Sequence, residues 1–246
     1  MKRVRSKGGM EVKCPRNRVV VRVPATTANM GPGFDALGMG IDIWNEISVE
    51  RAGSFSIETE GEGVGAIPEE VGPNGESKHT VMVALKRAFE YAGETLPPVR
   101  VCCRNRVPVC SGFGSSSAAI VGGLVAGLAL AGAPRRPGAR ARARATRAPH
   151  AALAQVSPAI YGGIQLSVQL CAIATAEPRE NPQLALSRRV PTPEGMRLVA
   201  YVPSEKTRFS FASKDKTTEM RALLPATIPR ADAVFNIQRT ARLSVE

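Results

Sequence analysis

Aromatic side chains are scarce in this chain of 246 residues, where Phe, Trp and Tyr make up 4% of the sequence. Cysteine is also rare, and the five cysteines form no C-x-x-C pair. This odd, unpaired set argues against a disulfide framework or a zinc site and favours a reducing compartment. No apolar run reaches the ~20 residues that a membrane-spanning helix needs, so we expect no membrane partner.

Acidic residues are absent from residues 133–155, which hold six arginines and account for half of the formal net charge of +12. This segment contains neither aromatic residues nor a nucleic-acid-binding motif, so we expect no nucleic-acid partner. The basic stretch 1–17 has no apolar segment of the kind found in a secretory signal. We expect it to be a basic N-terminal tail of a cytoplasmic protein, with organelle targeting left open.

Hydrophobic residues make up 43% of the chain, enough to build one large domain or two small ones. Mixed strand and helix patterns without strict βαβ alternation predict an α+β fold. We expect strands at 19–23 (ending at Pro24), 97–108, from about 163 and at 196–203, and a hairpin of 44–53 with 54–63. We expect helices in 80–93 (stopping at Gly93), from about 116 to 131, at 217–225 and from Asp232.

The uncharged segment VPVCSGFGSSSAA (107–119) directly precedes the second of these helices. A helix N-terminus presents unpaired N–H groups and a partial positive charge, which suits a phosphate. Gly112 and Gly114 would let the backbone approach the anion closely. The segment is not a Walker A loop, because no Lys-Ser/Thr pair follows the glycines. The alternative interpretation is a Gly/Ser turn that caps a buried helix.

Two stretches, VPATTANMGPGFDALGMGID (23–42) and PVCSGFGSSSAA (108–119), resemble motifs of the GHMP kinase family, and within it the homoserine kinases. Residues 156–168 and 223–239 resemble later segments of the same family. The resemblance implies a ribosomal-protein-S5-like N-terminal domain and a ferredoxin-like C-terminal domain. It also implies transfer of the ATP γ-phosphate to the hydroxyl of L-homoserine, in threonine biosynthesis.

The resemblance also implies site residues and cofactors, namely ATP and Mg²⁺. Asn29 and Asp35 would line the pocket for the substrate, and Arg239 would face its carboxylate. Asp35 could instead cap a turn, and Arg239 could be a solvated helix residue. Ser116 would be the magnesium ligand. The nucleotide would be held by Pro108, Ser111, Gly112, Phe113, Gly114, Ser115, Ser116, Ser117 and Ala118.

The sequence departs from the family pattern in two places. In residues 133–155 the expected His, Asp and Asn of an E-G-H-P-D-N-type motif fall at Ala152, Ala154 and Gln155. No third Gly-rich motif follows Arg239. We therefore expect an irregular Arg-rich insert at 133–155 and an incomplete C-terminal domain, truncated relative to the family. An out-of-frame reading of a GC-rich gene is one explanation of the insert, and a selected basic patch is the other.

These departures define the expected domains: a tail (1–17), an ATP-binding domain that includes the insert (18–165), and a partial C-terminal domain (166–246). Two other functions stay open. The chain could phosphorylate a different small alcohol as another GHMP kinase, or it could bind nucleotide without catalysis. Homodimer formation is also left open.

Overall fold

The computed structural model describes residues 16–31, 33–132, 150–170, 184–192, 194–204, 225 and 227–242. Strands and helices alternate irregularly along the chain, which confirms the α+β class. Within the described residues, the elements in chain order are β1 (Arg18–Ala28), β2 (Leu37–Arg51), β3 (Ser56–Gly61), α1 (Thr80–Ala92), β4 (Val99–Asn105), α2 (Ser115–Leu130), α4 (His150–Tyr161), β5 (Ile164–Leu170), β6 (Leu184–Val190) and α7 (Arg230–Arg242).

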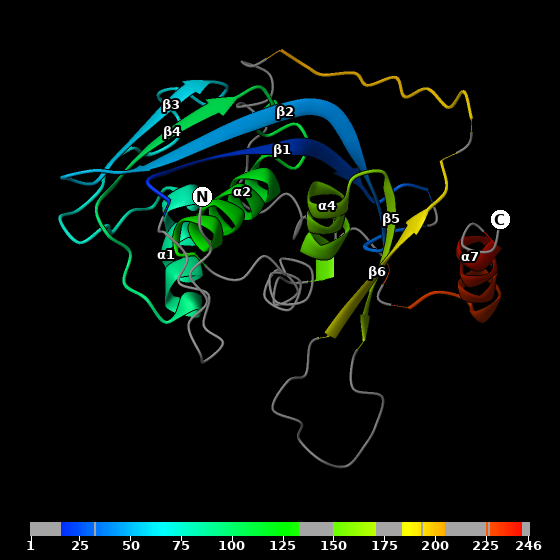
Figure 1. The fold of residues 1–246 in the computed structure, drawn as a ribbon. Coiled ribbons are helices and arrows are strands. Elements are labelled where there is room, and N and C mark those ends of the chain that lie inside the picture. Colours follow the sequence, from blue (N-terminus) through cyan, green and yellow to red (C-terminus); the bar gives the residue numbers. More distant parts are fainter. Residues whose placement is uncertain are drawn as a thin grey trace.

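The strands form one mixed sheet in the order β3-β4-β2-β5-β6, with β1 paired to β2 outside this path. β3 and β4 are parallel, while all other pairs are antiparallel. The long β2 connects the two ends of the sheet, because its residues 46–51 pair with β4 and its residues 37–39 pair with β5. Figure 1 shows β2 as the longest arrow, curving from one end to the other.

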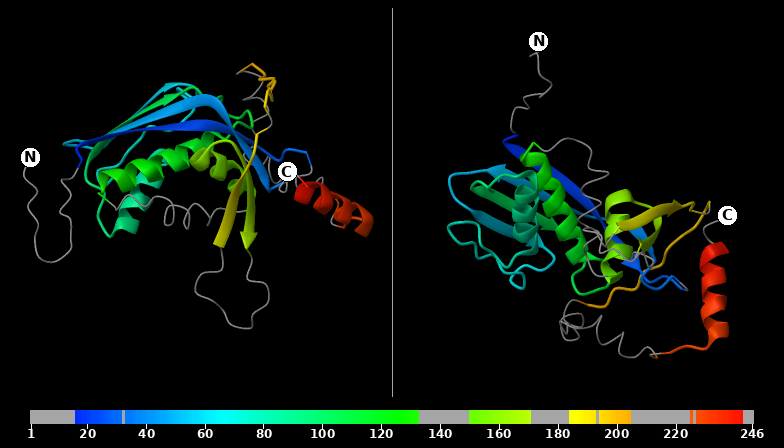
Figure 2. Two further views of the ribbon diagram at one scale, coloured as in Figure 1. Left: turned by 45° about the vertical axis from the view of Figure 1, so that its right-hand side comes forward. Right: turned by 90° about the horizontal axis from the view of Figure 1, so that it is seen from below.

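Helices α1, α2 and α4 lie against one face of the sheet, which arches over them (Figures 1 and 2). The largest buried cluster combines valines of β2 and β4 with Leu85 and Phe89 of α1 and Leu130 of α2. The two helices approach closely because small residues face each other: a Cβ added at Gly123 would lie 2.7 Å from the Cβ of Ala84. None of the described helices has both the length and the apolarity to cross a membrane.

The expected hairpin of residues 44–53 with 54–63 is wrong. Both stretches form strands, but β4 lies between β2 and β3. β3 instead pairs in parallel with β4, through a crossover that includes α1. Alternation of apolar and polar residues identifies a strand but not its neighbour, and here the crossover places Leu85 and Phe89 of α1 against the sheet.

The expected end of the first strand at Pro24 is also wrong. β1 continues to Ala28, with a shift in its register between Pro24 and Ala25. Among the described residues β1 pairs only with β2, so it is an edge strand at Pro24. Because an edge strand and a bulge both tolerate a residue without an N–H, the strand can pass through the proline.

The irregular insert expected at 133–155 is corrected at its C-terminal end. Residues 133–149 lie outside the described residues, but 150–155 are the first half of helix α4. Leu153 and Ala154 are buried, and the apolar side of this helix packs beneath β1, β2 and β5. The expected domain boundary at 165/166 lies within β5. Nothing in the structure tests the division into two domains, which stays a prediction.

Candidate functional site: the loop that begins helix α2

The loop between β4 and α2 ends in two glycines with left-handed backbone, Gly112 at φ +83° and Gly114 at φ +68°. Gly114 is the N-cap of α2 and has no side chain with which to bond the first helical turn. The first bond of the helix runs from the N–H of Ala118 to the carbonyl of Gly114 (2.8 Å). The N–H groups of residues 115–117 precede that bond, which is the arrangement that suits an anion.

The entry to the loop is held by a buried side chain of β2. Asn45 is 3% exposed, and its Oδ1 accepts hydrogen bonds from the N–H groups of Arg106 and Val107, each at 2.9 Å. A buried amide oxygen with two backbone donors is well satisfied and rigid. This contact fixes the point at which the chain leaves the sheet.

The exit of the loop is held against β1 and α4. The N–H of Thr26 donates to the carbonyl of Phe113 (3.0 Å). The Thr26 hydroxyl donates to Oε1 of Gln155 (2.7 Å), and Nε2 of Gln155 donates to the carbonyl of Gly112 (3.3 Å). A Cβ added at Gly114 would collide with both Thr26 Oγ1 and Gln155 Oε1. The glycine is therefore required by space as well as by its backbone conformation.

The predicted nucleotide-binding residues fall into three groups. Phe113 and Ala118 are buried in the core, so only their backbone can face a ligand. The hydroxyl of Ser111 donates to the carbonyl of Pro108 (2.6 Å) and accepts from the N–H of Phe113 (3.3 Å), so it shapes the loop. The remaining predicted residues, Gly112, Gly114, Ser115, Ser116 and Ser117, form the exposed or half-buried rim at the start of α2.

The structure brings Asn29 and Asp35 together in the turn that joins β1 to β2. The N–H of Asp35 donates to Oδ1 of Asn29 (2.7 Å). Both residues have left-handed backbone, at φ +62° and +56°, a conformation that Asn and Asp adopt more readily than other non-glycine residues. The turn begins one residue after β1, the strand that contacts the α2 loop at Thr26. Their role in binding substrate stays a prediction.

Arg239 lies in helix α7, and its side chain is outside the described residues. Figures 1 and 2 draw α7 apart from α2 in all three views. The structure therefore does not bring this part of the chain to the α2 loop, and the predicted role of Arg239 stays a prediction.

A magnesium site is not assembled by protein residues in the part of the chain that the structure describes. Ser116 is exposed on the first turn of α2, but no group of three or more His, Cys, Asp or Glu side chains there could hold a metal ion. Residues 133–155 contain no acid. One hydroxyl is a poor ligand set for Mg²⁺, which prefers carboxylates and phosphate oxygens, so the described residues do not fit a magnesium ion by themselves.

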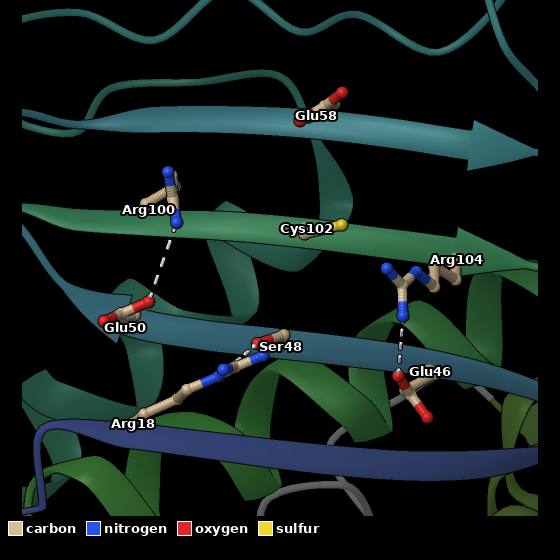
Figure 3. A pocket seen from close by; sticks show the side chains of 8 residues that line it. All are labelled: Arg18, Glu46, Ser48, Glu50, Glu58, Arg100, Cys102 and Arg104. Atoms are coloured by element: carbon tan, nitrogen blue, oxygen red, sulfur yellow. Dashed lines mark hydrogen bonds and ion pairs between the residues drawn. The ribbon is translucent and has the colours of Figure 1, made fainter.

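A hollow of about 270 Å³ lies on the opposite face of the sheet, which none of the described helices covers (Figure 3). Its charges pair across strands, with Arg104 3.6 Å from Glu46 and 2.9 Å from Glu60. Burial and the neighbouring carboxylate of Glu60 raise the pKa of the Cys102 thiol, which disfavours the nucleophilic thiolate. This hollow is a solvated charged face. It is lined by Arg18, Glu46, Ser48, Glu50, Glu58, Arg100, Cys102 and Arg104.

Sequence reasoning missed two residues of the site. Thr26 lies inside the motif at 23–42, where nothing in the sequence marks its hydroxyl as part of the site. Gln155 stands in the sequence where the family motif has an Asn. The available signal was its position: counted back from VSPAIYGG, it occupies the place of a polar family residue. The structure shows that this position is next to the α2 loop.

Comparison with known proteins agrees with this geometry. The family model described as GHMP kinases N terminal domain matches residues 79–163, which include the α2 loop. A homoserine kinase from Desulfitobacterium hafniense is 37% identical over 227 residues, covering 92% of this chain and 67% of the relative. A homoserine kinase from Moorella thermoacetica is 35% identical, covering 91% of this chain and 67% of the relative.

The solved structure of homoserine kinase from Cytophaga hutchinsonii superposes with a TM-score of 0.63 at 20% identity, over 96% of this chain and 69% of that one. At this identity the likeness shows a shared fold. This chain spans about two thirds of the length of the curated relatives it matches.

Proposed function

This chain belongs to the homoserine kinase family of GHMP kinases, and we propose that it binds ATP at the α2 loop and transfers the γ-phosphate to the hydroxyl of L-homoserine. The observation that carries the proposal is the start of α2, where three N–H groups precede the first helical hydrogen bond behind a left-handed Gly114. The relatives that this chain matches are named homoserine kinases, which supports L-homoserine as the acceptor.

The residues of this chain act mainly by positioning. The N–H groups of residues 115–117 and the partial positive charge of the helix would stabilise phosphate oxygens as charge moves during transfer. The paired Asn29 and Asp35 would offer an amide and a carboxylate to an amino-acid substrate, whose ammonium group pairs with an acid. Magnesium would arrive with the phosphates of ATP, and dimer formation stays open.

The experiment measures ADP release by the 246-residue chain with homoserine, mevalonate or shikimate as acceptor. We expect release above background with homoserine alone. Release with mevalonate or shikimate instead would identify another GHMP kinase activity and overturn the choice of acceptor.

Nucleotide binding without turnover is the second candidate, and the composition of residues 133–155 favours it. Phosphoryl transfer depends on several contacts that act together, and loss of one commonly costs about 100-fold in rate. Alanine stands where the family motif has His and Asp, at residues 152 and 154. A version of the chain with 133–155 restored to the family pattern separates the candidates: turnover by that version alone would identify the present chain as a binder.

A further inference from the structure

We propose that Gln155 is a positioning residue that sets the shape of the nucleotide-binding loop, an inference that rests on the proposed ATP site. The side chain reaches out of α4 and contacts two other parts of the site at once. Its carbonyl oxygen receives the Thr26 hydroxyl of β1, and its amide nitrogen donates to the carbonyl of Gly112 in the loop.

Within the loop, the hydroxyl of Ser111 bonds Pro108 and Phe113, but the carbonyl of the intervening Gly112 is bonded by the amide of Gln155. A Cβ added at Gly112 would meet no atom within 4 Å, so packing around that position adds no restraint. Glycine has the largest conformational freedom of any residue, and ordering it costs more entropy. The amide of Gln155 holds the carbonyl of Gly112 and thereby restricts the peptide that leads into α2.

The contact is also positioned to orient the N-cap. Gly114 lies so close to Thr26 and Gln155 that no Cβ fits between them. The three residues therefore form one packed layer beneath the first turn of α2. Thr26 is completely buried, and its N–H donates to Phe113 while its hydroxyl donates to Gln155. β1 and α4 thus hold the loop from both sides, with the N–H groups of residues 115–117 beyond it.

The length of the side chain matters for this arrangement. Gln155 must reach Thr26 in one direction and Gly112 in the other, with each amide atom used once. A carboxylate at this position would keep the acceptor for Thr26 but lose the donor, placing an oxygen against the Gly112 carbonyl. Substitution by Glu therefore removes one contact at almost constant volume.

Two matched substitutions test the proposal in the full chain. Q155E removes the bond to Gly112, and T26V removes the hydroxyl that orients Gln155, while T26S keeps that hydroxyl. We expect Q155E and T26V each to raise the Kd of trinitrophenyl-ATP, a fluorescent ATP analogue, by about tenfold, with T26S within about twofold of the unsubstituted chain. In the double variant Q155E/T26V the Kd should rise by less than the product of the two single fold-changes, because both substitutions break the same hydrogen-bond network.

A stability control separates positioning from general weakening. Val101 is completely buried in β4 and belongs to the core cluster away from the loop. V101A should lower the Tm at least as much as Q155E does, with no change in the Kd. Equal Kd values for Q155E, T26V and the unsubstituted chain would overturn the proposal. A rise in Kd for V101A as large as that for Q155E would also overturn it, because general weakening of the fold would then explain the effect.

A second measurement needs no nucleotide. Amide hydrogen exchange in residues 108–118 should be faster in Q155E than in the unsubstituted chain and unchanged in V101A. If the unsubstituted chain does not bind the analogue, the proposed function fails, and the exchange experiment still decides on Gln155. Unchanged exchange in Q155E would overturn the positioning role.

Discussion

The two ends of the sheet differ in how their side chains are covered. At the end formed by β3, β4 and the second half of β2, one face packs against α1 and α2, and the other carries paired charges. At the end formed by β5 and β6, apolar side chains are exposed within the described structure, with Val168 48% and Leu186 56% accessible. Helix α7 likewise exposes Phe235 and Ile237.

This difference indicates which end of the sheet contributes most to stability and which end supports the candidate site. Burial of apolar surface is the main favourable contribution to folding, so the first end carries most of it. The α2 loop is attached to that end through Asn45, while Phe113 packs with Ala25 and Val107 beside the first half of β2. A binding loop on a rigid support loses little entropy when it binds.

The largest effect is expected where the stable end meets the proposed site, at Gly114. Substitution by valine would collide with Thr26 and Gln155 and would place a β-branched residue at φ +68°. We expect a loss of nucleotide affinity of about 100-fold or more, because hydrogen bonds to a charged group contribute about 1.5–3 kcal/mol each and about 2.7 kcal/mol corresponds to 100-fold in Kd. Titration with an ATP analogue measures it.

Gly112→Ala is the matched control for Gly114→Val, because a Cβ there meets no atom within 4 Å although the backbone is also left-handed. The binding free energy of Gly112→Ala for the ATP analogue should weaken by about 1–2 kcal/mol at most, because of backbone strain. Equal losses of affinity in the two variants would show that backbone conformation, and not the contact with Thr26 and Gln155, decides the effect.

The largest effect on stability is expected in the core of the stable end. Phe89 of α1 is completely buried among the valines of β2 and β4. Phe89→Ala should lower the free energy of unfolding by about 3–5 kcal/mol, measured by urea denaturation. A loss below about 1 kcal/mol would mean that this end does not carry the stability assigned to it here.

A smaller, pH-dependent effect is expected at the start of α1. Nδ1 of His79 accepts from the N–H of Val81 (3.2 Å), which requires a neutral ring. Burial lowers the pKa of His79 below its ordinary 6.5, although Glu69 acts in the opposite direction. Below pH 6.5 the unfolded chain binds more protons than the folded one, so stability should fall as the pH drops, by at most about 1.4 kcal/mol per pH unit.

His79→Asn keeps a side chain suited to the N-cap and removes the titrating group. Urea denaturation between pH 7.5 and 5 should therefore show a smaller pH dependence in this variant than in the unsubstituted chain. The same pH dependence in both would assign the effect to other groups.

The smallest effect is expected at the exposed end. Ile237 of α7 is 68% exposed, so Ile237→Gln should change the free energy of unfolding by no more than about 0.5 kcal/mol. Thermal unfolding of the full chain provides the measurement. A loss comparable to that of Phe89→Ala would show that α7 packs as tightly as α1 and would remove the contrast between the two ends.

The sequence predicted most helices and strands correctly but not which strands pair, and the strand expected at 196–203 is wrong, because those described residues form no strand. Residues 217–224 of the helix expected at 217–225 lie outside the described residues. The helix ending at Gly93 was confirmed, and Gly93 has the left-handed backbone of a C-cap. The helix that follows the glycine loop was confirmed as α2, and the strand expected near 163 begins at Ile164. These features depend on local periodicity and caps. The parallel pairing of β3 with β4 depends on contacts between distant residues, which no local pattern encodes.

The site was predicted in part for the same reason. Glycines and serines before an apolar segment indicate a phosphate loop, and family motifs located Asn29 and Asp35. The contact of Gln155 with Thr26 joins residues 129 positions apart, and the periodicity of neither segment points to the other. The start of α4 at His150 was also not predictable from composition, because arginines and prolines, which do not favour a helix, directly precede it.

The long separation between Thr26 and Gln155 has a consequence for synthesis of the protein. Strands β1–β4 and helices α1 and α2 are all complete by residue 130, so they can begin to pack while the ribosome is still adding later residues. The loop before α2 acquires its last hydrogen bonds only when α4 has been made and has docked. The nascent chain should therefore fold the β1–β4 part of the sheet before the site is complete, and the capacity to bind nucleotide should appear late in translation.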